Sequence, residues 1–304
     1  MASLLLDFES MKILPSFRNA LKISLIPVIA VTAVTSQATA QVVRSAAGPA
    51  AANIQGAVDA FRADLGGALN PNVAGSFGSG RREINWDGVP DTFSSPNNLP
   101  ANFFNVNSPR GVVFSTPGSG FQVSADSSNP TSTPVQFGNI DPNYPAFFEP
   151  FSQERLFTAI GSNIVDVSFF IPGSLVAALT SGFGVVFSDV DLANTTSLQF
   201  FDAANNPLGG PFFAPGVGGS QTFSFLGVSF SGAIVSRVRI TNGNQVLMAG
   251  NTGQDLVVMD DFIYGEPVAR TAGVPESGRT LPLLGGAVVI LFLMLRLPRM
   301  CTTA

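Results

Sequence analysis

Between Asn163 and Tyr264 the chain alternates short apolar runs with clusters of Gly, Pro and Asn, and no helical pattern interrupts them. Short strands separated by turn signals predict an all-β fold, and a jelly-roll-like β-sandwich of about ten strands suits a domain of this length. No repeat of fixed period is present, which argues against a propeller or solenoid. The runs are Ile164–Ile171, Phe183–Val190, Leu198–Phe201, Thr222–Phe230, Ile234–Ile240 and Leu256–Tyr264.

Residues 75–160 are rich in turn-forming residues and carry shorter extended runs at 111–115, 121–124 and 155–159. We expect long loops that join short strands there. The chain has 27 Phe but only two Tyr and one Trp. Large side chains without a polar group favour a dry core between two sheets.

One short helix is expected ahead of the sandwich. Ile54, Val58, Phe61 and Leu65 recur at spacings of four, three and four residues, as on one face of a helix, and Gly66-Gly67 ends the pattern. An isolated helix of this length is marginal in water, so it should pack against the main fold. Residues 41–51 are small and Ala-rich, and we interpret them as a flexible lead-in.

Both ends of the chain carry apolar segments, and the first is typical of an export signal. Lys12, Arg18 and Lys22 precede an apolar run at 23–31, and Ala38-Thr39-Ala40 forms a small-x-small cleavage site. Cleavage by signal peptidase after Ala40 is expected. The alternative is a membrane anchor, but the run is too short for a span and Pro27 interrupts it.

The second apolar segment, Leu281–Leu295, is followed by Arg296 and Arg299. Fifteen residues of helix rise about 22 Å, less than a hydrocarbon core of ~30 Å. The flanking arginines favour the cytoplasmic side of the membrane. An ordinary single-pass anchor is the alternative interpretation.

Ahead of this segment stand Val274, Pro275, Glu276, Ser277 and Gly278. This motif, the short apolar helix and the basic end together resemble the sorting signal of exosortase substrates, the PEP-CTERM proteins and their VPDSG-CTERM relatives. Glu276 replaces the Asp of the VPDSG form, and Ser277 stands where the PEP form has Pro. The resemblance implies export in a Gram-negative cell, transient residence in the inner membrane, removal of the tail by an exosortase-type transpeptidase, and a cell-surface or extracellular location.

These signals divide the chain into four parts. Residues 1–40 are the predicted signal peptide, and 41–75 hold the lead-in and the helix. Residues 76–270 form the predicted sandwich, and 271–304 the sorting signal, with its transmembrane helix at 281–295.

Composition excludes several classes of function. The sequence has no His and one Cys, so imidazole catalysis, an internal disulfide and a Cys-based zinc site are absent. The predicted mature part, residues 41–274, has nine basic and seventeen acidic residues. Its excess of negative charge argues against binding nucleic acid. It contains no Lys, which excludes a Ser–Lys catalytic dyad. A lyase that uses a tyrosine would have only Tyr144 and Tyr264.

Two pairs of carboxylates are candidate metal ligands. Asp189 and Asp191 stand at the end of one predicted strand, and Asp260 and Asp261 lie inside the last strand. Carboxylate oxygens at a sheet edge suit a hard cation such as Ca²⁺, and a sandwich can bring distant strands together. The alternative is that all four are solvated strand-end and turn residues.

The single Trp86, followed by Asp87, is a candidate ligand-binding group. An indole can stack on a sugar ring while neighbouring polar groups bond the hydroxyls. The alternative, which we favour, is a core tryptophan followed by an Asp-Gly turn.

Two functions remain open at this stage. The first is a non-catalytic surface or extracellular-matrix protein of an envelope or biofilm, with polysaccharide as a candidate ligand. The second is a secreted polysaccharide lyase or glycosidase on the same fold; a glycosidase needs two opposed carboxylates.

Overall fold

A computed structural model describes residues 40–270 of the protein. The predicted signal peptide, the motif at 274–278 and the apolar segment 281–295 lie outside these residues, apart from Ala40. Within 40–270, no helix combines the length and the apolar character that a membrane crossing requires.

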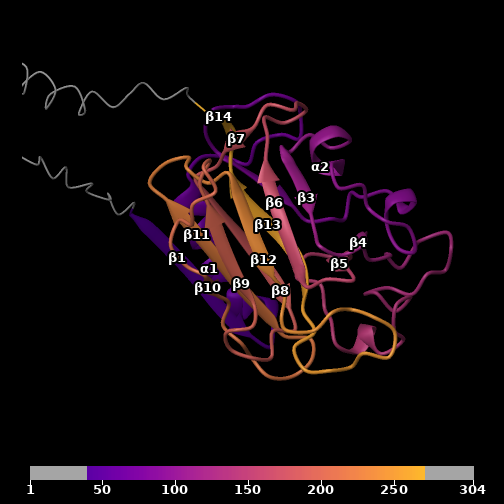
Figure 1. Cartoon of the computed structure of the whole chain (residues 1–304). Helices are drawn as coiled ribbons and strands as arrows, with labels where there is room; N and C mark the ends of the chain where they lie inside the picture. Colours follow the sequence, from indigo (N-terminus) through magenta and orange to yellow (C-terminus); the bar gives the residue numbers. More distant parts are fainter. Residues whose placement is uncertain (1–39, 271–304) are drawn as a thin grey trace, which may run out of the picture. The chain divides into compact units, whose positions relative to one another are not determined.

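The larger sheet has seven antiparallel strands in the order β1-β11-β8-β13-β5-β4, with β2 also paired to β13 (Figure 1). Strand β13 therefore lies at its centre. The strands are β1 (Gln41–Gly48), β2 (Arg81–Ile84), β4 (Gly120–Val123), β5 (Phe157–Ile160), β8 (Gly182–Ser188), β11 (Phe223–Phe230) and β13 (Val258–Gly265).

The second sheet has five strands in the order β10-β9-β12-β6-β3, and β7 and β14 form a separate pair. From β6 to β13, leaving out the two-residue strands β7 and β10, successive strands alternate between the two large sheets. The five-stranded sheet contains β6, β9 and β12, and the seven-stranded sheet contains β8, β11 and β13. The bounds are β3 (Val112–Ser115), β6 (Ile164–Phe169), β7 (Ala178–Leu179), β9 (Ser197–Phe201), β10 (Phe212–Phe213), β12 (Arg237–Thr241) and β14 (Val268–Ala269).

Aromatic side chains join the two sheets into a sandwich. Phe169 of β6 lies 6.1 Å from Phe183 of β8, and Phe200 of β9 lies 5.4 Å from Phe230 of β11, measured between ring centroids. These rings belong to one buried cluster that draws on both sheets. The expected all-β sandwich with a phenylalanine-rich core is confirmed, and the nine ranges predicted as strands between 111 and 264 each overlap one of the observed strands.

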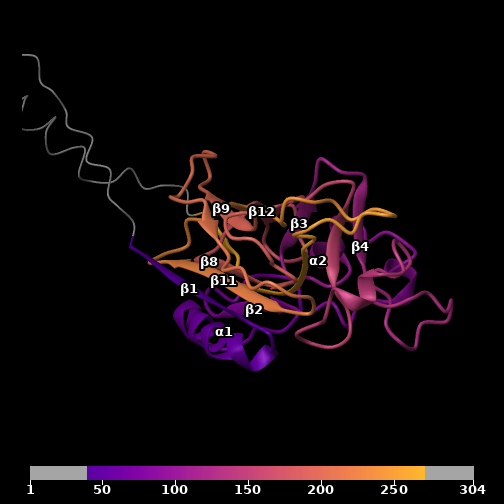
Figure 2. The ribbon, with the colours of Figure 1, turned by 90° about the horizontal axis from the view of Figure 1, so that it is seen from below.

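The predicted helix stripe is also confirmed. Helix α1 (Ala51–Leu65) buries Ile54, Val58, Phe61 and Leu65 against the outer face of the seven-stranded sheet, opposite the second sheet (Figure 2). The close approach needs a glycine beneath the helix: a Cβ added at Gly227 would lie 2.7 Å from the Phe61 ring. Short helices follow at Asp91–Phe93, Phe103–Val106 (α2) and Tyr144–Ala146.

The expectation of a flexible lead-in at 41–51 is wrong. Residues 41–48 form strand β1, which pairs with β11 along its whole length, from Gln41 opposite Phe230 to Gly48 opposite Phe223. Ala, Ser and Gly have low intrinsic β-propensity, so the local pattern gives little sign of a strand. The edge of β11, about 180 residues further along the chain, supplies the hydrogen-bonding partner.

Candidate functional site

Trp86 lies in the core, as the favoured interpretation predicts, and it is not available to stack on a sugar ring. Its side chain is 1% exposed, and its ring is stacked on Phe157 at 4.0 Å, with Phe104 and Phe262 edge-on. The indole N–H donates to the backbone carbonyl of Asp260 at 2.7 Å. Both the apolar surface and the single donor are therefore already used within the fold.

Asp87 is half-buried and hydrogen-bonds the backbone of another segment. Its Oδ1 accepts the backbone N–H of Arg155 at 3.1 Å, and burial raises its pKa. The Arg155 guanidinium in turn reaches Asp91 and Asp126, each at 2.6 Å. Asp87 thus helps to fix the segment that leads into β5.

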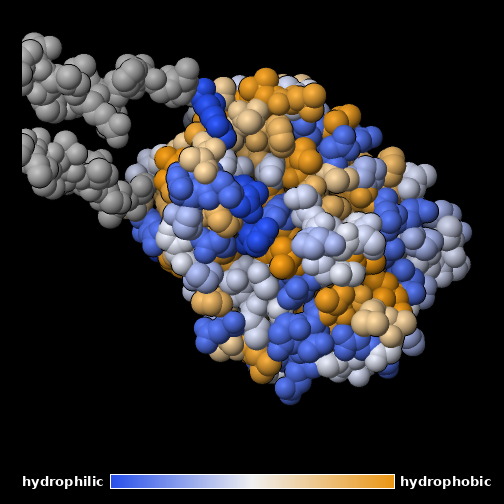
Figure 3. Space-filling view, viewed as in Figure 1, coloured by the Kyte–Doolittle hydropathy of each residue, from blue (hydrophilic) through white to orange (hydrophobic). Residues whose placement is uncertain are grey.

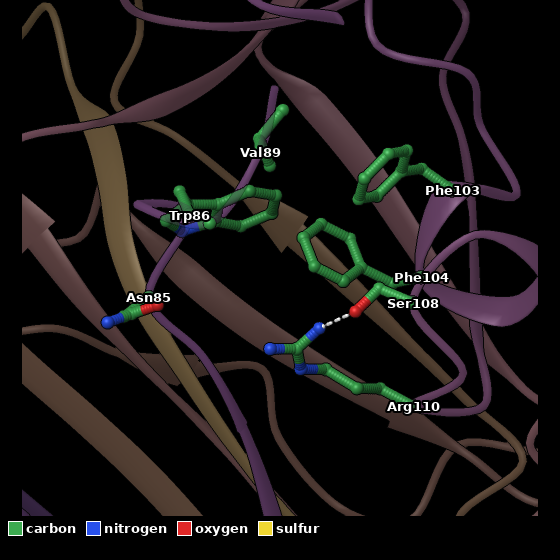
Figure 4. A pocket seen from close by; sticks show the side chains of 8 residues that line it. Asn85, Trp86, Val89, Phe103, Phe104, Ser108 and Arg110 are labelled. Carbon is green, nitrogen blue, oxygen red and sulfur yellow. Dashed lines mark hydrogen bonds between the residues drawn. The ribbon is translucent and has the colours of Figure 1, made fainter. Parts of the chain in front are cut away.

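A small cavity lies beside Trp86 (Figure 4). Its volume of about 40 Å³ holds a water molecule or two and is far below the ~300 Å³ of a typical ligand pocket. Arg110 hydrogen-bonds Ser108 there and lies 5.1 Å from the centre of the Phe104 ring. Burial lowers the pKa of Arg110. The lining residues are Asn85, Trp86, Gly88, Val89, Phe103, Phe104, Ser108 and Arg110.

The structure does not bring the four predicted metal ligands together. Across residues 40–270, no group of three or more His, Cys, Asp or Glu side chains is arranged to hold a metal ion. The pairs Asp189/Asp191 and Asp260/Asp261 instead have different neighbours, so the expected four-aspartate centre is wrong. Asp189 and Asp191 follow the end of β8, beyond the pair of Ser188 with Val258, whereas Asp260 and Asp261 lie inside β13.

Asp260 and Asp261 occupy a β-bulge, where two residues of β13 stand opposite the single Val186 of β8. Asp260 Oδ2 accepts the backbone N–H groups of Phe151 and Ser152 at 2.6 and 3.2 Å, and Ser152 Oγ lies 2.6 Å from Asp261 Oδ1. Burial, followed by the adjacent Asp261, raises the pKa of Asp260, and burial raises the pKa of Asp261. The pair anchors the 151–152 loop to the sheet.

Asp189 and Asp191 lie at one end of the sandwich with a third carboxylate, Asp255, that the sequence did not single out. Asp255 Oδ1 accepts the backbone N–H groups of Asp191 and Leu192 at 2.8 and 3.1 Å. Burial, together with the negative charges of Asp191 and Asp255, raises the pKa of Asp189 to about 7. Asp255 follows Gly253 and Gln254 and lies just outside the predicted strand that begins at Leu256. Its position therefore forms no sequence pattern with Asp189 and Asp191 that would identify it as a neighbour.

A buried ion pair at the other end of the sheet was also missed. Arg82 and Glu266, 184 residues apart, meet in a two-point contact with N–O distances of 2.7 and 3.0 Å, and their side chains are 0% and 1% exposed. The remaining N–H groups of Arg82 donate to the backbone carbonyls of Pro71, Gly75 and Pro109. Only the chain topology brings these groups together.

Both tyrosines are committed to the fold as well. The Tyr144 hydroxyl donates toward the carbonyls of Met248 and Asn251, and the Tyr264 hydroxyl donates to the carbonyl of Arg110 at 3.0 Å. Burial raises the pKa of each hydroxyl. Neither is poised to act as a base on a polysaccharide.

Comparisons with known proteins add little to this geometry. No protein-family profile and no curated protein matches the sequence. Among solved structures, the enzymatically active domain of tailspike protein 4 of bacteriophage CBA120 is similar over 59% of this chain and 22% of that one, with 14% identity and a TM-score of 0.27. The chain thus spans less than a quarter of that structure, and a likeness this weak carries no argument about activity.

Proposed function

We propose that this chain is an exported, exosortase-processed cell-surface or extracellular-matrix protein without catalytic activity, built on a jelly-roll-like sandwich. The observation that supports the proposal is that every strand and helix described within residues 40–270 lies between the predicted cleavage site and the motif at 274–278. Strand β1 begins at Gln41, directly after the predicted cleavage site, and β14 ends at Ala269, before the motif that starts at Val274. Processing at both sites leaves every described strand and helix in the mature protein.

The pairing of β1 supports cleavage after Ala40 rather than further along the chain. All eight residues of β1 are matched with β11, so removal of any of them would expose part of the β11 edge. Exposed strand edges promote association with other chains. A mature protein that begins at Gln41 keeps this edge covered.

The surroundings of the polar groups support a non-catalytic role. The sequence has no His, its Trp and both Tyr are buried, and the buried pair Asp260 and Asp261 is held by Ser152 and the 151–152 backbone. A polysaccharide partner would therefore meet exposed polar groups or phenylalanines. Figure 3 shows one face on which hydrophilic and hydrophobic residues are interspersed in this way.

The test is expression of the full chain in Gram-negative cells with and without an exosortase. We expect secreted or surface material with Gln41 at its N-terminus and without the 281–295 segment, measured by mass spectrometry of both termini. Without the exosortase, the tail should stay attached and the protein should remain with the inner membrane. Full-length protein in the cytoplasm, or a surface form that keeps its tail in exosortase-positive cells, would overturn the proposal.

A motif variant sharpens the test. Pro275→Ala should block removal of the tail while leaving cleavage after Ala40 unchanged, whereas Pro71→Ala, a proline inside the fold, should be processed normally. The purified surface form should release no products from acidic polysaccharides. Turnover that is lost on substitution of a single Asp or Glu would instead establish the lyase or glycosidase alternative.

A further inference from the structure

Three loops meet at the end of the sandwich where β8 and β12 finish and β13 begins. Asp189 and Asn242 stand there, two residues after the core residues Phe187 and Ile240, and Asp255 stands two residues before the core residue Val257, which directly precedes β13. All three side chains are buried, with exposures of 5%, 2% and 0%.

Backbone contacts hold these loops against one another. Ser188, the last residue of β8, is paired with Val258, the first residue of β13. The N–H of Asn244 donates to the carbonyl of Asp255 at 3.3 Å, and Gly243 packs so closely on Asp255 that a Cβ there would collide with its carbonyl. The N–H of Gly243 also donates to Thr196 Oγ1 at 2.9 Å, which ties in the loop that follows Asp189.

Oxygen atoms without a hydrogen-bond donor collect at this end. Within the described part of the chain, four fully buried side-chain nitrogen or oxygen atoms have no hydrogen-bond partner. Three of them are Asp189 Oδ1, Asn242 Oδ1 and Asp255 Oδ2. A buried polar atom without a partner costs about 1–3 kcal/mol, and native structures rarely tolerate several in one place. All three are acceptors, so the missing partner is a donor or a cation.

No ion pair within residues 40–270 brings a positive charge to this end. The arginines that form ion pairs within residues 40–270 contact other carboxylates, such as Asp64, Glu83, Asp166 and Glu266, and none contacts Asp189 or Asp255. The charges that act on Asp189 are those of Asp191 and Asp255, which are both negative. Two buried carboxylates without a counter-charge repel each other in the folded state.

We propose that Asp189, Asn242 and Asp255 bind a divalent cation, Ca²⁺, at this end of the sandwich. Two carboxylates and an amide oxygen are the donor types that Ca²⁺ takes, and it completes a shell of six to eight oxygens with backbone carbonyls and water. The site differs from the four-aspartate centre expected from the sequence, because Asp260 and Asp261 take no part and Asn242 contributes a neutral oxygen. Zinc, which prefers nitrogen and sulfur ligands, has none here.

The test uses the full-length protein, purified in mild detergent and stripped with a chelator. Calorimetric titration with CaCl₂ should show saturable binding of one ion per chain. The unfolding midpoint, followed by the fluorescence of the single buried Trp86, should rise by about 5–10 °C at a hundredfold excess of Ca²⁺ over its Kd. Mg²⁺ at equal concentration should give a smaller shift, since it demands a tighter octahedral shell.

Matched variants locate the ion. Asp189→Asn and Asp255→Asn should each weaken Ca²⁺ binding at least tenfold, whereas Asp261→Asn and Asp202→Asn should bind as the wild type does. If Asp255→Asn does not fold, the titrations of Asp189→Asn and of the wild type still test whether Ca²⁺ binds at this site. Absence of binding and of any thermal shift at millimolar Ca²⁺ would overturn the proposal and leave a shared proton or a water molecule as the occupant. Loss of binding in Asp261→Asn alone would overturn the location.

Discussion

The two ends of strand β13 handle buried charge in opposite ways. At the end that follows Gly265, Glu266 meets the guanidinium of Arg82, which also donates to backbone carbonyls of two loops. At the end that precedes Val258, Asp255 and Asp189 are equally buried, but neither forms an ion pair with an arginine of residues 40–270, and each keeps one oxygen without a partner among these residues. Both ends lie in the same sheet and differ in where the compensating charge comes from.

The comparison teaches that burial of a charge requires a counter-charge but not one from the same chain. Arg82 neutralises Glu266 and at the same time closes the loops around Pro71 and Pro109, so this end is complete when the chain folds. In the proposed site, the end at Asp255 is complete only when a cation from solution binds there. One end should therefore be insensitive to the ionic composition of the buffer, and the other should depend on it.

The largest effect is expected at the self-sufficient end. Arg82→Met leaves Glu266 buried without its partner, and the free energy of unfolding should fall by about 3–5 kcal/mol. Denaturant titration of the full-length protein, followed by Trp86 fluorescence, measures this loss, which should be the same with Ca²⁺ and with chelator. The double variant Arg82→Met/Glu266→Leu should recover much of it. A loss below 1 kcal/mol would show that the ion pair does not hold this end together.

The opposite sign is expected at the other end. In calcium-free buffer Asp189→Asn removes a charge that repels Asp191 and Asp255, so it should stabilise the protein by about 1–2 kcal/mol. In saturating Ca²⁺ the same variant should be less stable than the wild type, because it holds the ion more weakly. Paired denaturation curves in the two buffers test this reversal. Equal effects in both buffers would remove the contrast between the two ends.

The buried carboxylates in the bulge of β13 should make the free energy of unfolding depend on pH. Asp261 faces Asp260 on its own strand, Arg62 of α1 and Glu83 of β2, and burial raises its pKa. The folded state therefore holds a proton that the unfolded chain has already released, so this group's contribution to stability falls as pH rises from its unfolded pKa through its folded pKa. Asp261→Asn should lose that part of the pH slope, which begins near the pKa of an unfolded aspartate, about 4. Parallel wild-type and variant slopes would contradict the assignment.

The smallest effect is expected at the ion pairs of the second sheet, where water reaches the arginines. Asp166 of β6 is itself buried, and it lies 2.7 Å from Arg237 and 2.8 Å from Arg239, whose side chains are 21% and 44% exposed. Because water screens such pairs, Asp166→Asn should cost no more than about 1 kcal/mol, and less at high salt. Urea titrations of the wild type and of Asp166→Asn at low and high salt measure this loss in the free energy of unfolding. A cost as large as that of Arg82→Met would show that exposure does not separate the two kinds of ion pair.

Much of the fold could be predicted because it depends on local periodicity. The spacing of Ile54, Val58, Phe61 and Leu65 identifies the buried face of α1, and runs such as Phe183–Val190 identify the strands of the core. Strand β1 could not be found in this way, since Ala and Ser carry little strand signal and its partner β11 is remote in sequence. The two-residue strands β7, β10 and β14 are too short for any period to appear.

The candidate site depended on long-range contacts from the start. Trp86 could have faced solvent or the core on its sequence alone, and the ring of Phe157 settles that it faces the core. Asp189 was predicted to share a site with Asp260, but Asp260 binds the 151–152 loop. The pairing of β8 with β13 instead brings Asp255 to the segment around Asp191, and Gly243, next to Asn242, packs on Asp255.

The sequence by itself determined the all-β class, the amphipathic helix, the absence of imidazole chemistry and the excess of acidic residues, because each is a property of composition or of neighbours along the chain. Only the tertiary structure decided which acidic residues are neutralised. Arg82 contacts Glu266 across 184 residues, whereas Asp189 and Asp255 contact no arginine in the described part of the chain. Electrostatic energy depends on distances in space and on burial, and sequence separation sets neither.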